Sequence, residues 1–429
     1  MSKPVLDINE KPTGGQLLTL SFQHMFAMFG STILVPKLVG LSPAIALLTS
    51  GIATIIFLLV TQFKVPAYLG SSFAFITPIT LVAGLDKTGM SVNPGNAMIG
   101  AMAVGIVYAI VSLLIWKTGY KWLMRLLPPI VVAPVIIVIG LAISGTAVDM
   151  AMNVDGKYSG LHFSAALVTL FAAIIFTVYF KNILSAMPIL LGLIVGYLYS
   201  IVIGIVDFTP VKEAKMFAMP DFLIPGVDYE FNITAKILLA MVPIVIVTIS
   251  EHIGHQLVLG KVVNRNYVKD PGLHRSLLGD GLGTLASAFL GGPPKTTYGE
   301  NIGVLAITRV YSVYVILGAA VIAIVISFFG KVMALISTIP TAVLGGISIL
   351  LFGIIASSGL RMLVESKVDF SNNRNMVIAS VILVVGIGGA AVRFNETFSV
   401  EGMALAAMIG VVLNLVLPGR DKHVEDYNE

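Results

Sequence analysis

Two acidic residues within apolar sequence carry the groups most able to do chemistry. The first, Glu251, begins the run Glu251-His252-Ile253-Gly254-His255 and follows an uncharged stretch that starts after Lys236. Glu251 and His255 are four residues apart, so a helix places them on one face, whereas His252 points elsewhere. A carboxyl group and an imidazole on one face can bind a polar ligand and hold a proton. The alternative is a buried Glu–His pair whose two side chains bond only to each other. A zinc site is disfavoured because the chain has no cysteine and lacks the histidine spacings typical of zinc sites.

The second acid, Glu300, lies in a segment that is too irregular and too short for an ordinary membrane helix. Only 13 residues separate Lys295 from Arg309, about 20 Å of helix against a hydrocarbon core of about 30 Å. Gly299 and Gly303 flank Glu300, and glycine leaves backbone N–H groups open to a ligand. A ligand-binding carboxylate is therefore predicted, with an exposed loop acid as the alternative.

A matching irregularity occurs in the first half of the chain. Residues 65–78 and 291–303 both contain Pro and Gly where a regular helix is expected, and each carries two hydroxyl residues followed by an aromatic. These triplets are Ser71-Ser72-Phe73 and Thr296-Thr297-Tyr298. Interrupted segments at corresponding positions indicate a transporter binding site, the alternative being two re-entrant or poorly bounded segments.

Three other polar residues lie in apolar sequence. For Gln23 and His24, in the first apolar run, we expect hydrogen bonds to neighbouring helices rather than ligand binding. Asp280 lies one to two helical turns from Arg275. Two roles for Asp280 are equally compatible with this spacing, an ion pair with Arg275 at the membrane interface and a buried site that holds a proton.

Composition identifies the class of protein around these residues. The 429 residues are 57% hydrophobic and 11% charged, whereas soluble domains carry about 25% charged residues. The chain is therefore predicted to be an integral membrane protein. Its net charge of +4 is interpreted as the Lys/Arg excess of cytoplasmic loops, not as nucleic-acid binding.

Fourteen apolar runs follow one another, seven on each side of a polar stretch at 207–234. They are 16–36, 42–63, 66–85, 97–116, 126–148, 162–180, 183–206, 233–260, 273–290, 295–308, 311–330, 333–356, 375–392 and 401–418. If the N-terminus is inside, 17 of the 26 Lys and Arg residues fall in inner loops and 9 in outer loops. This bias predicts that both termini are cytoplasmic, and the odd number of spans per half predicts two inverted repeats.

At these residues the sequence resembles the nucleobase–ascorbate transporter family. Its signature is Gln, Glu or Pro, then Asn-x-Gly, four residues, Thr and usually Arg or Lys, which residues 300–309 match at every fixed position. The pair Gln23-His24, the triplet Ser71-Ser72-Phe73 and the run 251–255 also fit, so the resemblance covers nearly the whole chain.

The resemblance implies an all-α membrane fold of fourteen segments in two inverted seven-segment repeats. Broken segments 3 and 10 would carry short β-strands. Segments 1–4 and 8–11, residues 16–116 and 233–330, would form a core domain. Segments 5–7 and 12–14, residues 126–206 and 333–418, would form a gate domain.

The resemblance also implies a substrate site between the two strands and segment 8. Glu251 and Glu300 would bind the base by their side chains, Phe73 and Gly299 would offer backbone N–H groups, and Tyr298 would pack beside the ring. His255 would act through water or proton coupling. The implied proton-coupling residues are Glu251, His255 and Glu300.

Glutamate at the first signature position is typical of the family's uracil carriers, whereas its purine carriers usually have Gln there. The expected function is therefore proton-coupled uracil uptake by alternating access, with a xanthine or uric acid carrier as the alternative. One departure is Phe352, where the uracil carriers have Tyr. A nucleobase channel is less favoured because no filter motif is evident, and an enzyme because no nucleophile–base pair or metal set is evident.

The expected partners follow from this interpretation. They are a small nucleobase, membrane lipid and a second copy of the chain in a homodimer, with no nucleic acid. No cofactor is expected, and the proton is the expected coupling ion. The expected location is the cytoplasmic (inner) membrane.

Overall fold

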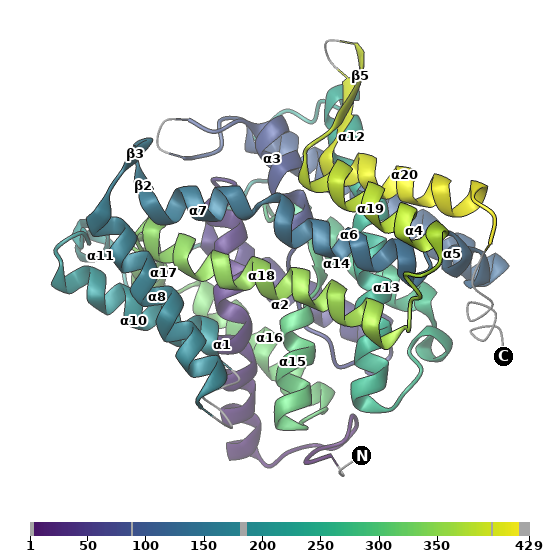
Figure 1. The fold of residues 1–429 in the computed structure, drawn as a ribbon. Helices are drawn as coiled ribbons and strands as arrows, with labels where there is room; N and C mark the ends of the chain where they lie inside the picture. Colours follow the sequence, from purple (N-terminus) through teal and green to yellow (C-terminus); the bar gives the residue numbers. More distant parts are fainter. Residues whose placement is uncertain (1–3, 87–88, 181–186, 396–397, 420–429) are drawn as a thin grey trace.

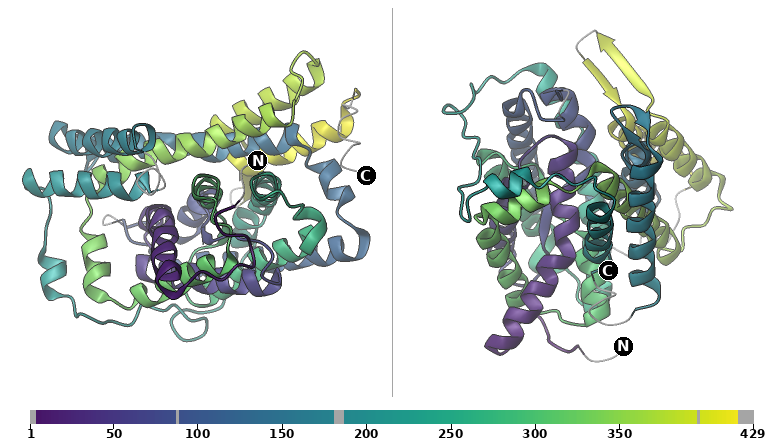
Figure 2. Two further views of the ribbon diagram at one scale, coloured as in Figure 1. Left: turned by 90° about the horizontal axis from the view of Figure 1, so that it is seen from below. Right: turned by 90° about the vertical axis from the view of Figure 1, so that its left-hand side faces the viewer.

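The chain forms two layers of helices that pack face to face. The computed structural model describes residues 4–86, 89–180, 187–395 and 398–419, so the start of the predicted run 183–206 and both chain ends lie outside the described residues. Figure 2 shows the layers edge-on, with the purple and green helices in one and the blue-teal and yellow-green helices in the other.

The first layer joins segments from both halves of the sequence, because α14 packs on α2 and α4 and α16 packs on α1 and α2. Its elements are α1 (Gly14–Leu38), α2 (Pro43–Val60), β1 (Leu69–Ser71), η1 (Phe73–Phe75), α3 (Ile76–Ala83), α4 (Pro94–Thr118), α12 (Ala235–Met241), α13 (Ile244–Val263), α14 (Leu273–Phe289), β4 (Lys295–Thr297), α15 (Gly299–Thr308) and α16 (Val313–Ser327).

The second layer also mixes the halves, because α18 packs on α6, α7 and α8 (Figure 1). Its elements are α6 (Pro129–Ala142), α7 (Ser144–Met152), β2 (Asn153–Val154), β3 (Lys157–Tyr158), α8 (Gly160–Val178), α10 (Pro188–Val202), α18 (Thr341–Glu365), α19 (Asn373–Ile387), β5 (Ala391–Asn395), β6 (Phe398–Glu401) and α20 (Gly402–Val416). Short connecting elements are α5 (Lys121–Leu126), α11 (Thr209–Glu213), η2 (Val268–Gly272) and α17 (Gly330–Ser337).

Proline sets where many of these helices begin. Pro43, Pro94, Pro129 and Pro188 each occupy the first turn of a helix, where a missing N–H costs nothing and the fixed φ suits the helix. Pro243 instead stands between α12 and α13, eight residues before Glu251, so the two helices meet about two turns before the polar run of segment 8.

Long apolar helices confirm the mostly helical membrane fold. Among the described residues seven helices are long and apolar enough to span a membrane, or eight if the bent pair α16–α17 counts as one span. Shorter apolar helices fill other predicted segments, namely Phe73–Ala83, Pro188–Val202, Asn373–Ile387 and Gly402–Val416.

The boundaries of one predicted run were wrong. The run 333–356 is divided between α17 and α18, and α18 continues to Glu365. Pro340 is the residue before α18 and stops the preceding turn, since proline cannot donate the hydrogen bond that would continue it. The apolar stretch therefore contains a break that hydropathy alone does not show.

The two interrupted segments meet in a short antiparallel pair. Leu69 pairs with Thr297, Gly70 with Thr296 and Ser71 with Lys295, so strands in segments 3 and 10 are confirmed. Each strand leads within two residues into a helix, β1 into η1 and α3, and β4 into α15. The pair therefore sets two helix N-termini on either side of one crossing point.

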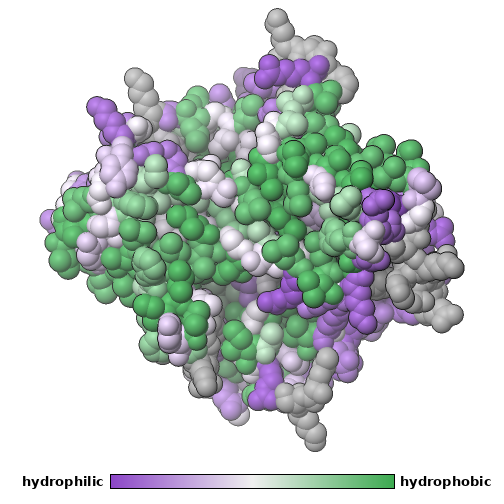
Figure 3. Space-filling model, in the orientation of Figure 1, coloured by the Kyte–Doolittle hydropathy of each residue, from purple (hydrophilic) through white to green (hydrophobic). Residues whose placement is uncertain are grey.

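The molecular surface supports an integral membrane protein. Figure 3 shows hydrophobic residues over much of the face formed by α8, α10 and α18, with hydrophilic residues gathered toward its edges. Phe171 and Ile175 on α8 and Leu198 on α10 are among the large apolar side chains that are exposed. Lipid tails can cover such a surface, whereas apolar patches of this extent are rare on soluble monomers.

Gly70 is required at the strand crossing. A Cβ at this position would lie 2.0 Å from the Tyr298 ring, so Gly70→Ala should cost on the order of 1–3 kcal/mol of stability through overpacking. Thermal unfolding of the purified chain in detergent should show a lower midpoint. Gly353→Ala is the control, since no atom lies within 4 Å of its Cβ position; equal midpoints for the two variants would contradict the packing described.

Candidate functional site

Glu300 lies in the first turn of α15, beside the strand crossing. Its Oε1 accepts a hydrogen bond of 2.9 Å from the Ser31 hydroxyl of α1, which fixes the carboxylate between two helices. The helix N-terminus also favours negative charge there. Sequence reasoning missed Ser31, because one serine in an apolar helix gives no signal.

Glu251 and His255 lie on α13, on the side that meets α15 and β4. Glu251 is buried, and its Oε2 makes no hydrogen bond to the described residues; the same is true of His255 Nδ1. Glu251 is close enough to Glu300 for the two charges to interact. The structure thus brings together the acids that the sequence singled out, and the alternative, a Glu251–His255 pair bonded to itself, is not formed among the described residues.

Gly299 allows α15 to approach α13. A Cβ at Gly299 would lie 2.9 Å from His255 Nε2, so even alanine would press against the imidazole. The glycine before Glu300 therefore has a steric role in addition to leaving its N–H open.

Three aromatic rings stand at the same point. The Phe73 ring stacks on Tyr298 with centroids 6.5 Å apart and meets Phe352 edge-on at 5.7 Å. The Tyr298 hydroxyl donates to the carbonyl oxygen of Ser71 over 3.2 Å. Phe352 belongs to α18, so this cluster joins the two layers. Because Phe352 has no hydroxyl group, it acts in this contact only by packing.

Two backbone N–H groups are open beside these rings. Phe73 and Gly299 are the first residues of η1 and α15, where the helix offers no internal acceptor. Neither N–H donates to another residue in the part of the chain that the structure describes. The neighbouring N–H groups are used, since Ser72 donates to Pro294 and Tyr298 donates to Tyr68 across the crossing.

His252 and Asp280 form a buried pair behind this site. His252 Nδ1 lies 2.8 Å from Asp280 Oδ2, and His252 Nε2 lies 2.8 Å from the Ser276 hydroxyl. Both the histidine and the aspartate are fully buried. Arg275 instead donates to the Val60 carbonyl, so the alternative of an interfacial Asp280–Arg275 pair is wrong.

The count of outer-loop cations placed Lys295 in a loop, but the structure places it in strand β4. It is 1% exposed, and its ammonium donates to the Ala46 carbonyl at 2.9 Å and to the hydroxyls of Ser50 at 2.9 Å and Ser71 at 3.4 Å. The lysine thus ties β4 to β1 and α2. A single charge beside two prolines resembles a loop in sequence, so its burial was not predictable.

Gln23 and His24 are buried on α1, and the His24 ring lies beside Asn301 of the signature. The Asn301 amide donates to the Pro66 carbonyl over 3.0 Å. Gln23 Nε2 and both His24 ring nitrogens lack a hydrogen bond to the described residues. The cross-helix hydrogen bonds expected of these two side chains stay a prediction, with Asn301 on α15 as the polar neighbour of the His24 ring.

The site combines carboxylates, open N–H donors and aromatic faces. Such a set can bind a small planar molecule that carries donors and acceptors on its edge. No group of three or more metal-ligating side chains occurs among the described residues.

Solved structures of membrane transporters share this fold. The transmembrane domain of the cyanobacterial bicarbonate transporter BicA aligns with a TM-score of 0.65 over 95% of this chain and 100% of its own, at 15% identity. The structure of SLC26A9 aligns with a TM-score of 0.67 over 93% and 64%, at 11% identity. These likenesses concern the fold alone.

Sequence comparison shows the family. The model of the Permease family matches residues 15–394, and the chain belongs to this family, the nucleobase–ascorbate transporters. The uracil permease of Bacillus caldolyticus is 63% identical over 100% of this chain and 98% of its own length. Those of Bacillus subtilis (strain 168) and Escherichia coli (strain K12) are 56% identical over 99% and 98%, and 42% over 97% and 94%.

The His252–Asp280 pair is predicted to stabilise the fold. Asp280→Ala leaves His252 Nδ1 with only the long contact of 3.4 Å to the Thr297 hydroxyl, and the loss of the shorter hydrogen bond costs on the order of 1–3 kcal/mol, whereas Asp280→Asn keeps an acceptor for it. Thermal unfolding of both purified variants should therefore show the larger loss for Asp280→Ala. If the alanine variant is as stable as the asparagine variant, the hydrogen bond does not support the helix pair.

Proposed function

We propose that this chain carries uracil across the cytoplasmic membrane together with protons, as a secondary transporter. The observation that carries the proposal is the meeting of Glu251 and Glu300 with the open N–H groups of Phe73 and Gly299 at one strand crossing. The names of the full-length relatives support uracil as the substrate.

The chemistry of uracil fits this set of groups. The base is planar and carries two N–H donors and two carbonyl acceptors on its edge. The carboxylates of Glu251 and Glu300 accept from N–H groups, and the N–H groups of Phe73 and Gly299 donate to carbonyl oxygens. The Tyr298 ring offers an apolar surface to one face of the base.

The two layers suit alternating access. In the proposal, residues 16–116 and 233–330 are the core domain and residues 126–206 and 333–418 are the gate domain. Helices pack closely within each layer, whereas α13 provides much of the contact between the layers through α6 and α20. The site lies on the first layer and meets the second at Phe352, so motion of one layer against the other would open it to alternate sides.

Proton coupling rests on the titratable groups at the site. Glu251 is buried and His255 and Glu300 are partly buried in one region between apolar helices, where an ionised group without a partner is costly. Binding of a neutral base and a proton together would leave fewer unpaired charges there.

The Lys/Arg bias of the loops favours a cytoplasmic position for both termini, and it still does so when Lys295 is left out of the count. The homodimer stays a prediction.

Glu300→Gln should weaken uracil binding. The glutamine amide presents a donor toward an N–H of the base, which leaves a buried polar group unpaired. This costs on the order of 1–3 kcal/mol, or roughly 5–150-fold in affinity. Isothermal calorimetry of the purified variant with uracil and with xanthine measures the change.

Glu213→Gln is the matched control, because Glu213 is an exposed acid on α11 and its replacement should leave binding unchanged. Wild-type uracil affinity in Glu300→Gln would remove Glu300 from the site. Tighter binding of xanthine than of uracil to the unmodified chain would favour the purine alternative.

Uptake should depend on a proton gradient and not on sodium. Labelled uracil should accumulate in proteoliposomes when an inward proton gradient is imposed, with or without sodium, because the proposed coupling groups are carboxyls and an imidazole. Collapse of the gradient with a protonophore should abolish accumulation. Uptake that follows a sodium gradient alone would show that the proton is not the coupling ion.

A further inference from the structure

A cavity that is not lined by Glu251 or Glu300 lies between the two layers. It has a volume of about 300 Å³ and is lined from the first layer by α3, α12 and α13 and from the second layer by α6, α19, β6 and α20. In the proposed orientation this is the outer side, because the end of segment 13 and the start of segment 14 meet here.

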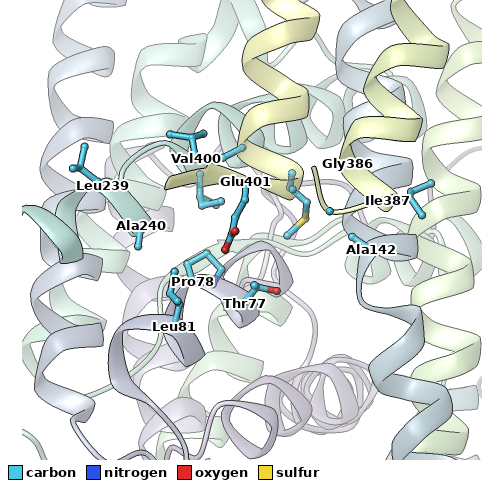
Figure 4. Close-up of a pocket in the computed structure, with 15 residues that line it drawn as sticks. Thr77, Pro78, Leu81, Ala142, Leu239, Ala240, Gly386, Ile387, Val400 and Glu401 are labelled. Carbon is cyan, nitrogen blue, oxygen red and sulfur yellow. The ribbon is translucent and has the colours of Figure 1, made fainter. Parts of the chain in front are cut away.

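One carboxylate enters this cavity. Figure 4 shows the Glu401 side chain extending from the end of β6 toward Pro78 and Thr77 of α3. No hydrogen bond or ion pair joins this carboxylate to another described residue. Most of the other lining side chains are apolar, among them Leu81, Leu239, Ile244 and Met403.

The cavity lies on the same elements as the central site. Thr77 is four residues after Phe73, and Ile244 is seven residues before Glu251, about one and two turns of helix. Residues seven apart also share one face of a helix, so α13 leads from the cavity toward Glu251. Both α3 and α13 thus lie between this cavity and the strand crossing.

From this arrangement we propose that the cavity is an outer vestibule site that holds one free pyrimidine base before it enters the central site. Glu401 accepts N–H hydrogen bonds from the edge of the base, and the apolar lining covers its faces. The volume is near the lower end of the range for ligand pockets, roughly 300–1,000 Å³, which suits a single base better than a nucleoside. The inference rests on the proposed function, since it assigns the same substrate class to a second site.

Residues of both layers line the cavity, so its shape depends on how the two layers are positioned. A base held there contacts α3 and α12 on one side and α19 and α20 on the other. Motion of one layer against the other must change this cavity, so occupation of the vestibule and movement of the layers are coupled. Glu401 is thus a specificity residue for entry, distinct from the residues of the central site.

The absence of cysteine from the chain allows a direct test. Ala240 lines the cavity, so Ala240→Cys places one thiol there, and Leu239→Cys replaces it if Ala240→Cys folds poorly. The rate of labelling by a membrane-impermeant thiol reagent is measured against uracil concentration. Three further variants are compared in this background, Glu401→Gln, Glu300→Gln and the exposed control Glu213→Gln.

Uracil should slow the labelling, and Glu401→Gln should raise the concentration for half-protection by at least about 5-fold, the effect of one unmade hydrogen bond. Glu300→Gln and Glu213→Gln should leave that concentration unchanged. Protection that responds to Glu300→Gln but not to Glu401→Gln would overturn the proposal, because it would come from the central site. Labelling that uracil never slows would also overturn it, even where calorimetry detects central binding.

The two proposals fail in different ways. If the unmodified chain binds no uracil by calorimetry, the proposed function is wrong. If it binds uracil and Glu401→Gln leaves protection unchanged, only the vestibule site is wrong, and Glu401 is then an acid that no base contacts.

Discussion

The antiparallel pairing of β1 with β4 is the constraint on which the rest of the site depends. In a membrane every backbone polar group needs a partner within the protein, and a helix that is broken inside the hydrocarbon core leaves several without one. Here two broken segments satisfy each other, through the three paired positions and through the flanking bonds from Ser72 to Pro294 and from Tyr298 to Tyr68. Because this pairing ends where two helices begin, it leaves the N–H groups of Phe73 and Gly299 open at one point.

Side chains then hold the crossing in place from behind. Lys295 donates to α2 and to Ser71, and Thr284 of α14 bonds both the N–H and the carbonyl of Lys295. The His252–Asp280 pair joins α13 to α14. The polar groups near the crossing thus include one set that joins the strands and helices to one another and another that is open to a ligand.

Much of this arrangement was predictable from sequence because it depends on local signals. Apolar run lengths identified the helical membrane fold, and paired interruptions by Pro and Gly located the two broken segments, whereas the strands in them followed from the family resemblance. The spacing of Glu251 and His255 put them on one helix face, and the ten-residue signature at 300–309 identified the family. Glu300 was recognisable because an ionisable side chain in an apolar membrane segment is costly and is therefore usually functional.

What could not be predicted depends on contacts between distant segments. Nothing in the first apolar run distinguishes Ser31, which bonds Glu300, from its neighbours. Lys295 was assigned to a loop because its acceptors lie on β1 and α2, far away in sequence. The division of the run 333–356 at Pro340 was missed because the sequence on both sides of it is apolar.

The central claim is that the groups at the strand crossing hold the base. The most direct test is a crystal structure of the chain with 5-bromouracil, in which the bromine's anomalous signal locates the ring. The account predicts a peak beside the Tyr298 ring, with the carboxylates of Glu251 and Glu300 and the N–H groups of Phe73 and Gly299 within hydrogen-bonding distance of the base. A base that occupies another part of the chain, with Glu251 and Glu300 making no contact to it, would contradict this account.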